Sequence, residues 1–338
     1  MSAPEPVSII IPAFNQLDYC RACIESIQVH TTWPYRLILV DNGSTDGVSE
    51  YFDTLVDQAT IIHTDANLGF SGGVNRGMEV ATGHVLLLNS DTVVTPGWLS
   101  RLVQVLERPG MGLVGPVSNS VAGPQQIDGL ESLTDSEAVT YAAARTLSHA
   151  GQYRAVSRLI GFCLLIHKKV VEDIGVFDER YETGNFEDDD YCTRARQAGY
   201  SLAIVEDSFV YHHGGRTMAA MGLHGTAYND LMERNRQRYE DKWGVTLSRE
   251  KHGRVERERL QAVAQDALAQ GDVQGAIVAL QAAIVAEPEE ATPYRDLGKV
   301  LLDAGKARLA VQCFVQAQER DPALDGLATL LAQAKAQL

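Results

Sequence analysis

The most concentrated group of chemistry-bearing side chains is a run of four carboxylates at residues 187 to 190, within the stretch NFEDDDYCTRARQAGY. Such a run could hold a metal ion, supply a catalytic base or begin a helix with favourable charges. The spacing of the residues that follow predicts a helix from about Glu187 to Gly199. The direction of each carboxylate on that helix therefore decides which chemistry it can do.

Helical geometry gives the four acids different directions, because neighbours on one helix face are three or four residues apart. Asp190 stands four residues before Arg194, a spacing that predicts an ion pair, and Asp189 heads a polar face that we expect in solvent, so both acids are expected to have ordinary surface roles. Asp188 heads the stripe that must face inward, which comprises Tyr191, Cys192, Ala195 and Gly199. An inward carboxylate at a helix N-terminus, with no basic partner in its own helix, is positioned to accept a proton.

Other candidate residues stand where predicted strands end. Apolar runs predict strands at residues 7–12, 36–41, 59–63 and 84–89, with helical patterns between them. Strands that alternate with helices imply an α/β fold with a mainly parallel sheet covered on both faces. Later in the chain, SLAIVE and SFVYHH predict two short strands at a mixed sheet edge. The carboxyl ends of parallel strands form the ligand crevice of such sheets.

Three of these strand ends and one glycine-rich loop carry polar residues. The first strand opens into PAFNQ, the second delivers Asp41 into DNGSTDG, and the fourth delivers NSD, with Asp91 just past the strand. The segment NLGFSGGVNRG follows the third strand, and its glycines and the helix start beyond them favour an anionic group. No GxGxxG follows the first strand, which disfavours ordinary NAD binding.

Composition excludes some classes of partner. The formal net charge of the 338 residues is −15, and acids outnumber bases on both sides of residue 253, so we expect no nucleic-acid partner. Five cysteines do not describe a disulfide framework, and Cys20 and Cys23 are expected to pack as small buried hydrophobes. No signal-length or membrane-length apolar run is present, so we expect no transmembrane segment and a cytoplasmic location.

The last 85 residues are alanine-rich, helical in pattern and self-similar at an offset of 34. Three residues recur at that offset: Gly271 as Gly305, Ala276 as Ala310, and Pro288 as Pro322. This is the period of tetratricopeptide repeats, in which paired helices stack into a small solenoid. We therefore predict an α/β domain at residues 1–250 and an all-α, tetratricopeptide-like domain at residues 254–338, with a final helix at residues 323–338.

The ordered motifs of the first domain resemble those of glycosyltransferase family 2, especially its bacterial rhamnosyltransferase-like branch. The resemblance covers residues 7 to about 217 and rests on these segments, in this order: VSIIIPAFNQ, VDNGSTDG, NLGFSGGVNRG, LLLNSDT, GFCLLIHKKVVEDIGVFDE, FEDDDYCTRARQAGY and VYHHGGRT. It implies a GT-A fold (a Rossmann-like, mainly parallel mixed sheet), a nucleotide-sugar donor, a divalent cation and inversion at the anomeric carbon.

The resemblance also implies which residues bind the donor. Those expected at the nucleotide are Pro12, Ala13, Asn15, Asp41, Asn67, Gly69 and Ser90. Asp41 is similar to the acid that hydrogen-bonds a pyrimidine base, a task that suits a carboxylate because uracil and thymine present an imide N–H. The competing interpretation for Asp41 is a turn with the adjacent Asn-Gly.

The resemblance assigns a metal site and a base. NSD at residues 89–91 occupies the place of the DxD metal motif, with Asn89 in place of the first acid, so Asp91 and His212 are expected to hold Mn²⁺ or Mg²⁺. His212 stands five residues before a hydroxyl residue, Thr217, as in the family. The family's ED motif places the general base at Asp188 and an acceptor-orienting residue beside it, at Glu187.

The predicted function is an inverting, metal-dependent glycosyltransferase that moves a sugar from a UDP- or dTDP-sugar to a hydroxyl acceptor. The acceptor would be a glycan, a lipid-linked glycan or a protein recruited by the repeats. Two alternatives remain: a nucleotidyltransferase of sugar phosphates, and a non-catalytic protein-binding scaffold with a degenerate glycosyltransferase domain. For the repeats themselves, assembly of a homo-oligomer competes with recruitment of a partner protein.

Overall fold

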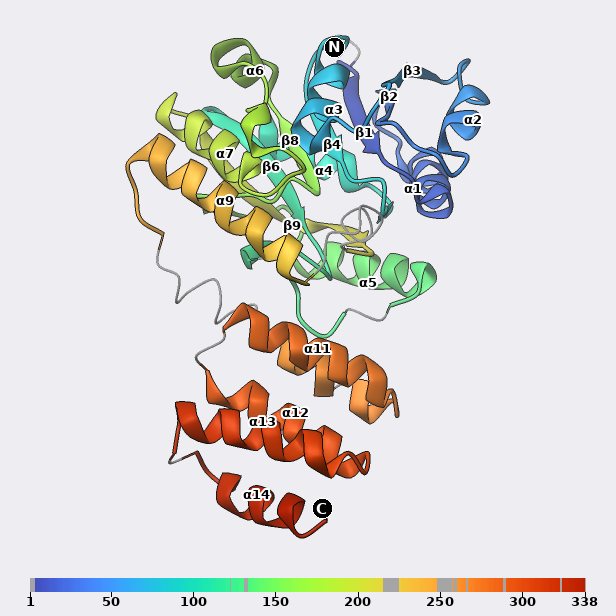
Figure 1. Cartoon of the computed structure of the whole chain (residues 1–338). Helices are drawn as coiled ribbons and strands as arrows, with labels where there is room; N and C mark the ends of the chain where they lie inside the picture. The colour runs from blue at the N-terminus through green and yellow to red at the C-terminus, as the bar shows by residue number, and fades with distance from the viewer. Residues whose placement is uncertain are drawn as a thin grey trace. The chain divides into compact units, whose positions relative to one another are not determined.

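The computed structural model describes residues 4–337, except 122, 131–132, 215–224, 248–256, 258–259, 266, 288–289 and 323. Contacts within the chain divide it into two compact units, Met1–Trp243 and Gly244–Leu338 (Figure 1). The linker expected around residues 250 to 254 lies outside the described residues. In the described parts of the chain, no helix is long and apolar enough to cross a membrane.

The first unit is built on one mixed sheet, to which the described residues contribute nine strands. Its strands are β1 (Val7–Ala13), β2 (Tyr35–Asp41), β3 (Ala59–His63), β4 (Val85–Leu88), β5 (Thr92–Val94), β6 (Met111–Val117), β7 (Tyr153–Val156), β8 (Cys163–Ile166) and β9 (Ser201–His212). The order is β3-β2-β1-β4-β8-β6-β9-β5, and β7 pairs with β9. The first four strands of this order run parallel, whereas β8 is antiparallel to both of its neighbours. The expected mixed α/β sheet is confirmed.

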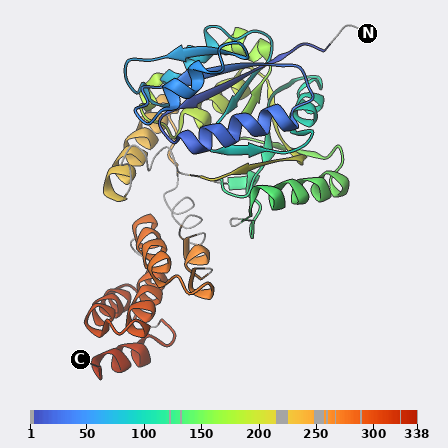
Figure 2. The ribbon, with the colours of Figure 1, turned by 90° about the vertical axis from the view of Figure 1, so that its right-hand side faces the viewer.

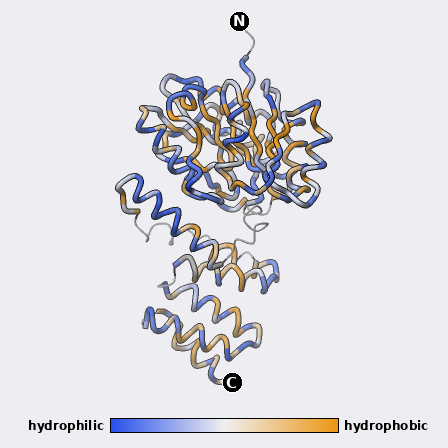
Figure 3. Tube along the Cα trace, turned by 45° about the horizontal axis from the view of Figure 1, so that its top comes forward, coloured by the Kyte–Doolittle hydropathy of each residue, from blue (hydrophilic) through white to orange (hydrophobic). Residues whose placement is uncertain are grey.

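Helices cover both faces of this sheet. The helices described in this unit are α1 (Leu17–His30), α2 (Val48–Asp53), α3 (Gly69–Met78), α4 (Trp98–Leu106), α5 (Asp135–Ser148), α6 (Lys168–Ile174), α7 (Glu187–Gln197) and α9 (Gly225–Trp243), with short 3₁₀ turns η1 (Gly123–Gln125) and η2 (Glu179–Tyr181). Because side chains alternate along a strand, Ile9 and Ile11 pack in one core with α1, α2 and α4, while Ile10 packs in the other with α3, α5 and α7. Figure 2 shows α1 along one face, and Figure 3 shows hydrophobic stretches concentrated on the central strands.

One strand prediction is wrong: SLAIVE and SFVYHH are not two strands but the single strand β9. The acidic pair between them looks like an interruption, yet the structure satisfies both acids. Glu206 forms ion pairs with Arg145 and Arg154, and Asp207 accepts a hydrogen bond from the Gly151 backbone N–H at 2.7 Å. The pairing of β6 with β9 shifts register at this point, so a bulge lets the strand continue.

The second unit is helical, as expected. Its helices include α11 (Val273–Ala286), α12 (Ala291–Asp303), α13 (Ala307–Arg320) and α14 (Leu327–Lys335), and residues 260–265 and 267–269 are helical as well. Gly271 and Gly305 both have left-handed φ, at 79° and 73°, in turns before helices, and Ala276 and Ala310 are both fully buried. Residues 34 apart therefore have matching environments, although Pro288 lies outside the described residues. The tetratricopeptide assignment stays a prediction.

Candidate active site

The carboxyl ends of β1 and β2 bring the first group of predicted residues together. The strand register places Ala13 opposite Asp41, and Asp41 opposite His63 at the end of β3. Pro12 and Ala13 are the last residues of β1, and Asn15 follows in a left-handed conformation with φ 57°. These loops form one edge of the sheet, as parallel strands require.

Asp41 is almost fully buried and has partners for both carboxylate oxygens. Oδ1 accepts a hydrogen bond from the Ser44 N–H at 2.9 Å, which closes the turn that competed with a binding role, and Oδ2 lies 3.1 Å from His63 Nδ1. Burial alone would raise the pKa of Asp41, but the bonds from His63 and Ser44 outweigh it and lower the pKa. The same Asp41 contact raises the pKa of His63, a residue that the sequence analysis missed although it ends a predicted strand.

The predicted asparagines Asn15 and Asn67 hold protein loops. Asn15 Oδ1 accepts a hydrogen bond from the Thr45 N–H at 2.8 Å, and Asn67 Oδ1 accepts one from the Gly69 N–H at 2.8 Å. A buried residue that was not predicted, Asn42, joins the same network. Its Nδ2 donates to Asn67 Oδ1 at 3.1 Å and to the Gly69 carbonyl at 3.0 Å. The loops after β1, β2 and β3 are therefore tied to one another by side-chain bonds.

Gly69 meets another part of the protein rather than open space. Its φ is 75°, and a Cβ added there would stand 2.0 Å from the Glu182 carbonyl oxygen. Only glycine allows the start of α3 to approach this loop so closely. The loop just before the carboxylate helix thus touches the glycine-rich segment.

Asp91 and His212 face each other across the pairing of β5 with β9, in which Thr92 stands opposite His212. His212 Nε2 lies 3.2 Å from Asp91 Oδ1, and His212 Nδ1 lies 2.7 Å from the Ser120 carbonyl oxygen. Because a carbonyl only accepts, Nδ1 carries a proton and Nε2 is the nitrogen that faces Asp91. Burial opposes the charged imidazole, but the Asp91 carboxylate outweighs burial and raises the pKa of His212.

The residues around this pair fit a divalent cation only in part. A carboxylate oxygen and an imidazole nitrogen are suitable donors for Mn²⁺ or Mg²⁺. No group of three or more His, Cys, Asp or Glu side chains is assembled for a metal among the residues that the structure describes. Asp91 and His212 could therefore serve as two ligands if a bound diphosphate supplied others. His213 contacts the rings of Tyr19 and Tyr211 instead, so the two adjacent histidines have different surroundings.

Asp188 is buried at the start of α7 and is fixed by backbone groups. Its Oδ2 accepts a hydrogen bond from the Gly161 N–H at 3.0 Å, and its Oδ1 accepts one from the Asp189 N–H at 2.8 Å. Each oxygen keeps a lone pair for a further hydrogen bond. Glu187 is equally buried, and its Oε2 has no hydrogen-bond partner in the structure. Burial, and then the neighbouring Asp188 charge, raise the pKa of Glu187 well above its ordinary value.

The expectation that Asp189 and Asp190 have surface roles is wrong. Asp189 forms an ion pair with Arg158 at 2.6 Å, and burial raises its pKa to about 7. Asp190 makes the predicted ion pair with Arg194 at 3.0 Å, but it is fully buried and also lies 2.6 Å from Lys242 Nζ. Both acids are covered by segments distant in the sequence, which the geometry of a single helix does not reveal.

Two consecutive residues, Gly161 and Phe162, connect the carboxylate helix with the Asp91–His212 pair. Gly161 holds Asp188, while the Phe162 ring stacks on His212 with centroids 5.3 Å apart. The Phe162 carbonyl also accepts a hydrogen bond from the Asn89 N–H at 2.8 Å, in the NSD segment. The predicted base and the predicted metal ligands therefore adjoin the same short segment before β8.

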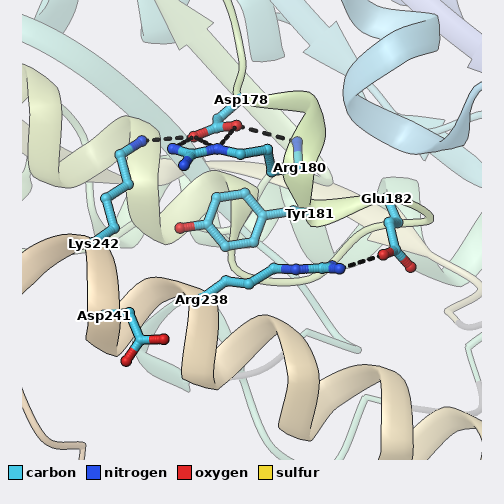
Figure 4. A pocket seen from close by; sticks show the side chains of 7 residues that line it. All are labelled: Asp178, Arg180, Tyr181, Glu182, Arg238, Asp241 and Lys242. Atoms are coloured by element: carbon cyan, nitrogen blue, oxygen red, sulfur yellow. Dashed lines mark hydrogen bonds and ion pairs between the residues drawn. The ribbon is translucent and has the colours of Figure 1, made fainter.

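A cavity of about 600 Å³ lies elsewhere in the first unit (Figure 4). Its lining residues are Asp178, Arg180, Tyr181, Glu182, Arg238, Asp241 and Lys242. Arg180 and Lys242 both form ion pairs with Asp178, and Arg238 pairs with Glu182, so these cations are already neutralised by protein. The predicted reaction residues do not line this cavity, and we do not place the reaction there.

Comparison with known proteins adds an independent line of evidence. Residues 8–175 match the family model described as Glycosyl transferase family 2. The chain is 28% identical over 217 residues to the glycosyltransferase AglE of Haloferax volcanii, a match that covers 61% of this chain and 66% of that protein. It is also 28% identical over 232 residues to the N-acetylglucosaminyl-diphospho-decaprenol L-rhamnosyltransferase of Mycobacterium tuberculosis, with 61% and 75% covered.

Other similarities are less complete. An uncharacterized protein of Sinorhizobium fredii, y4gI, is 30% identical over 224 residues, but the match spans 61% of this chain and only 24% of that protein. The solved structure of GalNAc-T7 with UDP, GalNAc and Mn²⁺ superposes with a TM-score of 0.49 at 13% identity, covering 61% of this chain and 43% of the other. The chain thus spans less than two thirds of AglE and about a quarter of y4gI.

Proposed function

We propose that this chain, which contains a glycosyltransferase family 2 domain, transfers a sugar from a UDP- or dTDP-sugar to an acceptor hydroxyl with inversion. The observation that carries the proposal is the segment Gly161–Phe162. Its Gly161 N–H contacts Asp188, the candidate general base, and its Phe162 ring contacts His212, a candidate ligand of the cation. An inverting displacement needs a base on one side of the anomeric carbon and charge stabilisation at the leaving group on the other.

Asp41 would recognise the pyrimidine base of the nucleotide-sugar donor. The lowered pKa of Asp41 favours an ionised carboxylate, which accepts a hydrogen bond from the imide N–H of uracil or thymine. Pro12, Ala13 and Asn15 would line the same pocket, since they follow the strand paired with β2. Asn67 and Gly69 would close it indirectly, through the loop network that Asn42 holds together.

Asp91 and His212 would hold Mn²⁺ or Mg²⁺, with Ser90 beside them. When bound, the cation supplies positive charge that stabilises the departing nucleotide diphosphate. The hydrogen bond from Nδ1 to the Ser120 carbonyl orients the His212 ring, so that its Nε2 is directed to the Asp91 carboxylate. The protein's own part here is to hold one carboxylate and one imidazole in fixed directions.

Asp188 would take the proton from the acceptor hydroxyl. Its carboxylate is held by the Gly161 N–H and stands at the N-terminus of α7, where the helix dipole favours a negative charge. Glu187, with its raised pKa, would be protonated, so it could donate a hydrogen bond to the acceptor while Asp188 accepts one. The two adjacent acids would then have opposite roles.

A donor screen tests this function. UDP- and dTDP-sugars are supplied with Mn²⁺, and nucleotide release is compared between the wild type and Asp188→Asn. dTDP-sugars belong in the panel because thymine presents the same imide N–H as uracil to the Asp41 carboxylate. Release of nucleoside diphosphate by the wild type supports transfer, whereas release of pyrophosphate would indicate a nucleotidyltransferase. Absence of turnover across the panel would favour a non-catalytic scaffold.

The helical unit would recruit a protein, namely the acceptor that receives the sugar. A cavity of about 460 Å³ in this unit is bordered by Leu268 and Val273, which are both 41% exposed. A concave, partly apolar surface of this kind suits a peptide segment. Leu268→Asp together with Val273→Asp should reduce transfer to the natural acceptor and leave donor hydrolysis unchanged. A loss of self-association in the same variant would favour the competing role, a homo-oligomer.

A further inference from the structure

The loop between η2 and α7 has an unusual backbone. Glu182, Asn185 and Phe186 are not glycine, yet their φ values are 52°, 73° and 72°. Glu182 also has ψ −118°, a combination that side chains with a Cβ rarely adopt. Such conformations persist only where surrounding groups hold them, and this loop leads directly into Glu187 and Asp188.

The group that holds the loop is the side chain of Asn235, on α9. Asn235 is fully buried. Its Nδ2 donates to the carbonyls of Tyr181, Gly184 and Asn185, at 2.7, 2.8 and 3.2 Å. Two N–H hydrogens are thus shared among three loop carbonyls, so one side chain fixes both ends of the loop.

Arg238, one turn further along α9, fixes the orientation of this amide. Its Nη1 donates to Asn235 Oδ1 at 2.7 Å, and its Nη2 bonds to the Glu182 carboxylate. Because Oδ1 faces a guanidinium and Nδ2 faces carbonyls, no other assignment of the amide satisfies its neighbours. Figure 4 shows Arg238 extending from its helix toward Glu182 along the cavity.

The opposite side of the loop touches the proposed donor site. The Glu182 carbonyl oxygen is 2.0 Å from the position that a Cβ on Gly69 would take, and the Thr183 Cα is 3.2 Å from it. Gly69 begins α3, and Asp188 follows the loop at the start of α7. The loop is therefore enclosed between the glycine-rich segment and Asn235, and its position sets how these two elements stand relative to each other.

We infer that Asn235 is a positioning residue for sugar transfer: it holds the 181–186 loop so that Asp188 and the Gly69 segment keep the spacing that the reaction needs. This role rests on the proposed function. Asn235 acts through the loop and itself contacts no reacting atom. An acceptor hydroxyl displaced by even about 1 Å from its productive position can lose roughly 10²-fold in rate, so a small shift of the loop is enough.

The test compares three variants of the full chain. Asn235→Asp keeps the size of the side chain but places a carboxylate against three carbonyls, and Arg238→Met removes the group that orients the amide. Gln237→Ala, at an exposed position of the same helix, is the matched control. We expect kcat for nucleotide release to fall about 30-fold or more in Asn235→Asp and less in Arg238→Met, with the donor KM changed less than 3-fold. Gln237→Ala should match the wild type.

Hydrogen exchange supplies a readout that does not depend on activity. The N–H groups of Gly184 and Asp189 are hydrogen-bonded to Tyr181 and Asp188 within this region, so they should exchange at least 10-fold faster in Asn235→Asp. Unchanged exchange overturns the inference, as does faster exchange with unchanged kcat. If the wild type transfers no sugar from any donor, the proposed function fails. The exchange result then still decides whether Asn235 holds the loop.

Discussion

The donor-side loops and the carboxylate helix α7 are organised in opposite ways. After β1, β2 and β3, short polar side chains such as Asn15 and Asn42 form hydrogen bonds with residues of the adjoining loops. Around α7, the acids Asp189 and Asp190 instead pair with Arg158 and Lys242, and Glu187 Oε2 has no partner. One region is ordered by neutral side-chain hydrogen bonds between its loops, whereas the other holds buried carboxylates that depend on cations from other segments.

The difference indicates that the donor-side loops are suited to binding and the α7 region to chemistry. A nucleotide brings many polar groups of its own, so a preformed and internally satisfied pocket can bind it at little cost. A general base must keep an available lone pair in an unusual environment. Hydrogen bonds from a local turn would occupy that lone pair. Satisfied loops therefore suit binding, and strained or unsatisfied groups suit chemistry. Perturbing each region should accordingly affect different quantities.

The largest expected effect is on the chemical side. Asp188→Asn keeps the shape of the side chain and its contact with the Gly161 N–H region, but it removes the proton acceptor. We expect kcat to fall about 10³-fold, within the range for loss of a general base, with donor binding unchanged. Initial rates of nucleotide release and calorimetric donor titration measure the two quantities. Normal transfer by this variant would remove Asp188 from the mechanism.

The next effect is on stability, at the place where the two regions touch. Gly69→Ala places a Cβ 2.0 Å from the Glu182 carbonyl and also forces alanine to a φ of 75°. Gly110→Ala is a matched control, because Gly110 has φ 78° and nothing within 4 Å. We expect Gly110→Ala to cost about 1–2 kcal/mol of unfolding free energy for the left-handed backbone, and Gly69→Ala to cost clearly more. Equal decreases in the free energy of unfolding, measured with denaturant, would mean that the 181–186 loop moves away from the added methyl group without cost.

A smaller effect is expected for donor binding. Asp41→Asn removes the carboxylate that would accept the pyrimidine imide hydrogen, and it removes the partner that raises the pKa of His63. A hydrogen bond to a charged group contributes about 1.5–3 kcal/mol, so donor KM should rise roughly 10- to 100-fold with kcat nearly unchanged. Ser49→Ala, which removes a hydroxyl 3.1 Å from the same histidine, is the comparison. An unchanged donor KM in Asp41→Asn would mean that Asp41 only stabilises the turn with Ser44 and does not bind the donor.

The same contrast explains what the sequence reveals. The parallel strands, the α7 start and the Asp190–Arg194 pair follow from periodicities that each segment carries within itself. The burial of Asp190 does not, because Lys242 and the α9 helix that cover it lie about fifty residues further along the chain. Asn42 was missed although it adjoins Asp41, since an asparagine before glycine reads as an ordinary turn residue. Local rules therefore predict strands and pairs within one helix, but not the contacts that Asn42, His63 and Asp190 make with segments distant in the sequence.

The smallest effect concerns Glu187 and depends on pH. Its pKa is raised in the folded state by burial and by the Asp188 charge, so its contribution to stability is fully present below the unfolded pKa and is lost as pH rises. Glu187→Gln removes this loss. The variant should therefore gain stability over the wild type above about pH 4.5, by at most about 1.4 kcal/mol per pH unit, until Glu187 ionises in the folded protein. Unfolding free energies at pH 5, 6, 7 and 8 measure the trend, with Glu172→Gln at an exposed position as the control. A difference that stays constant with pH would mean that Glu187 is ionised in the folded state, and that the two adjacent acids do not divide into a donor and an acceptor.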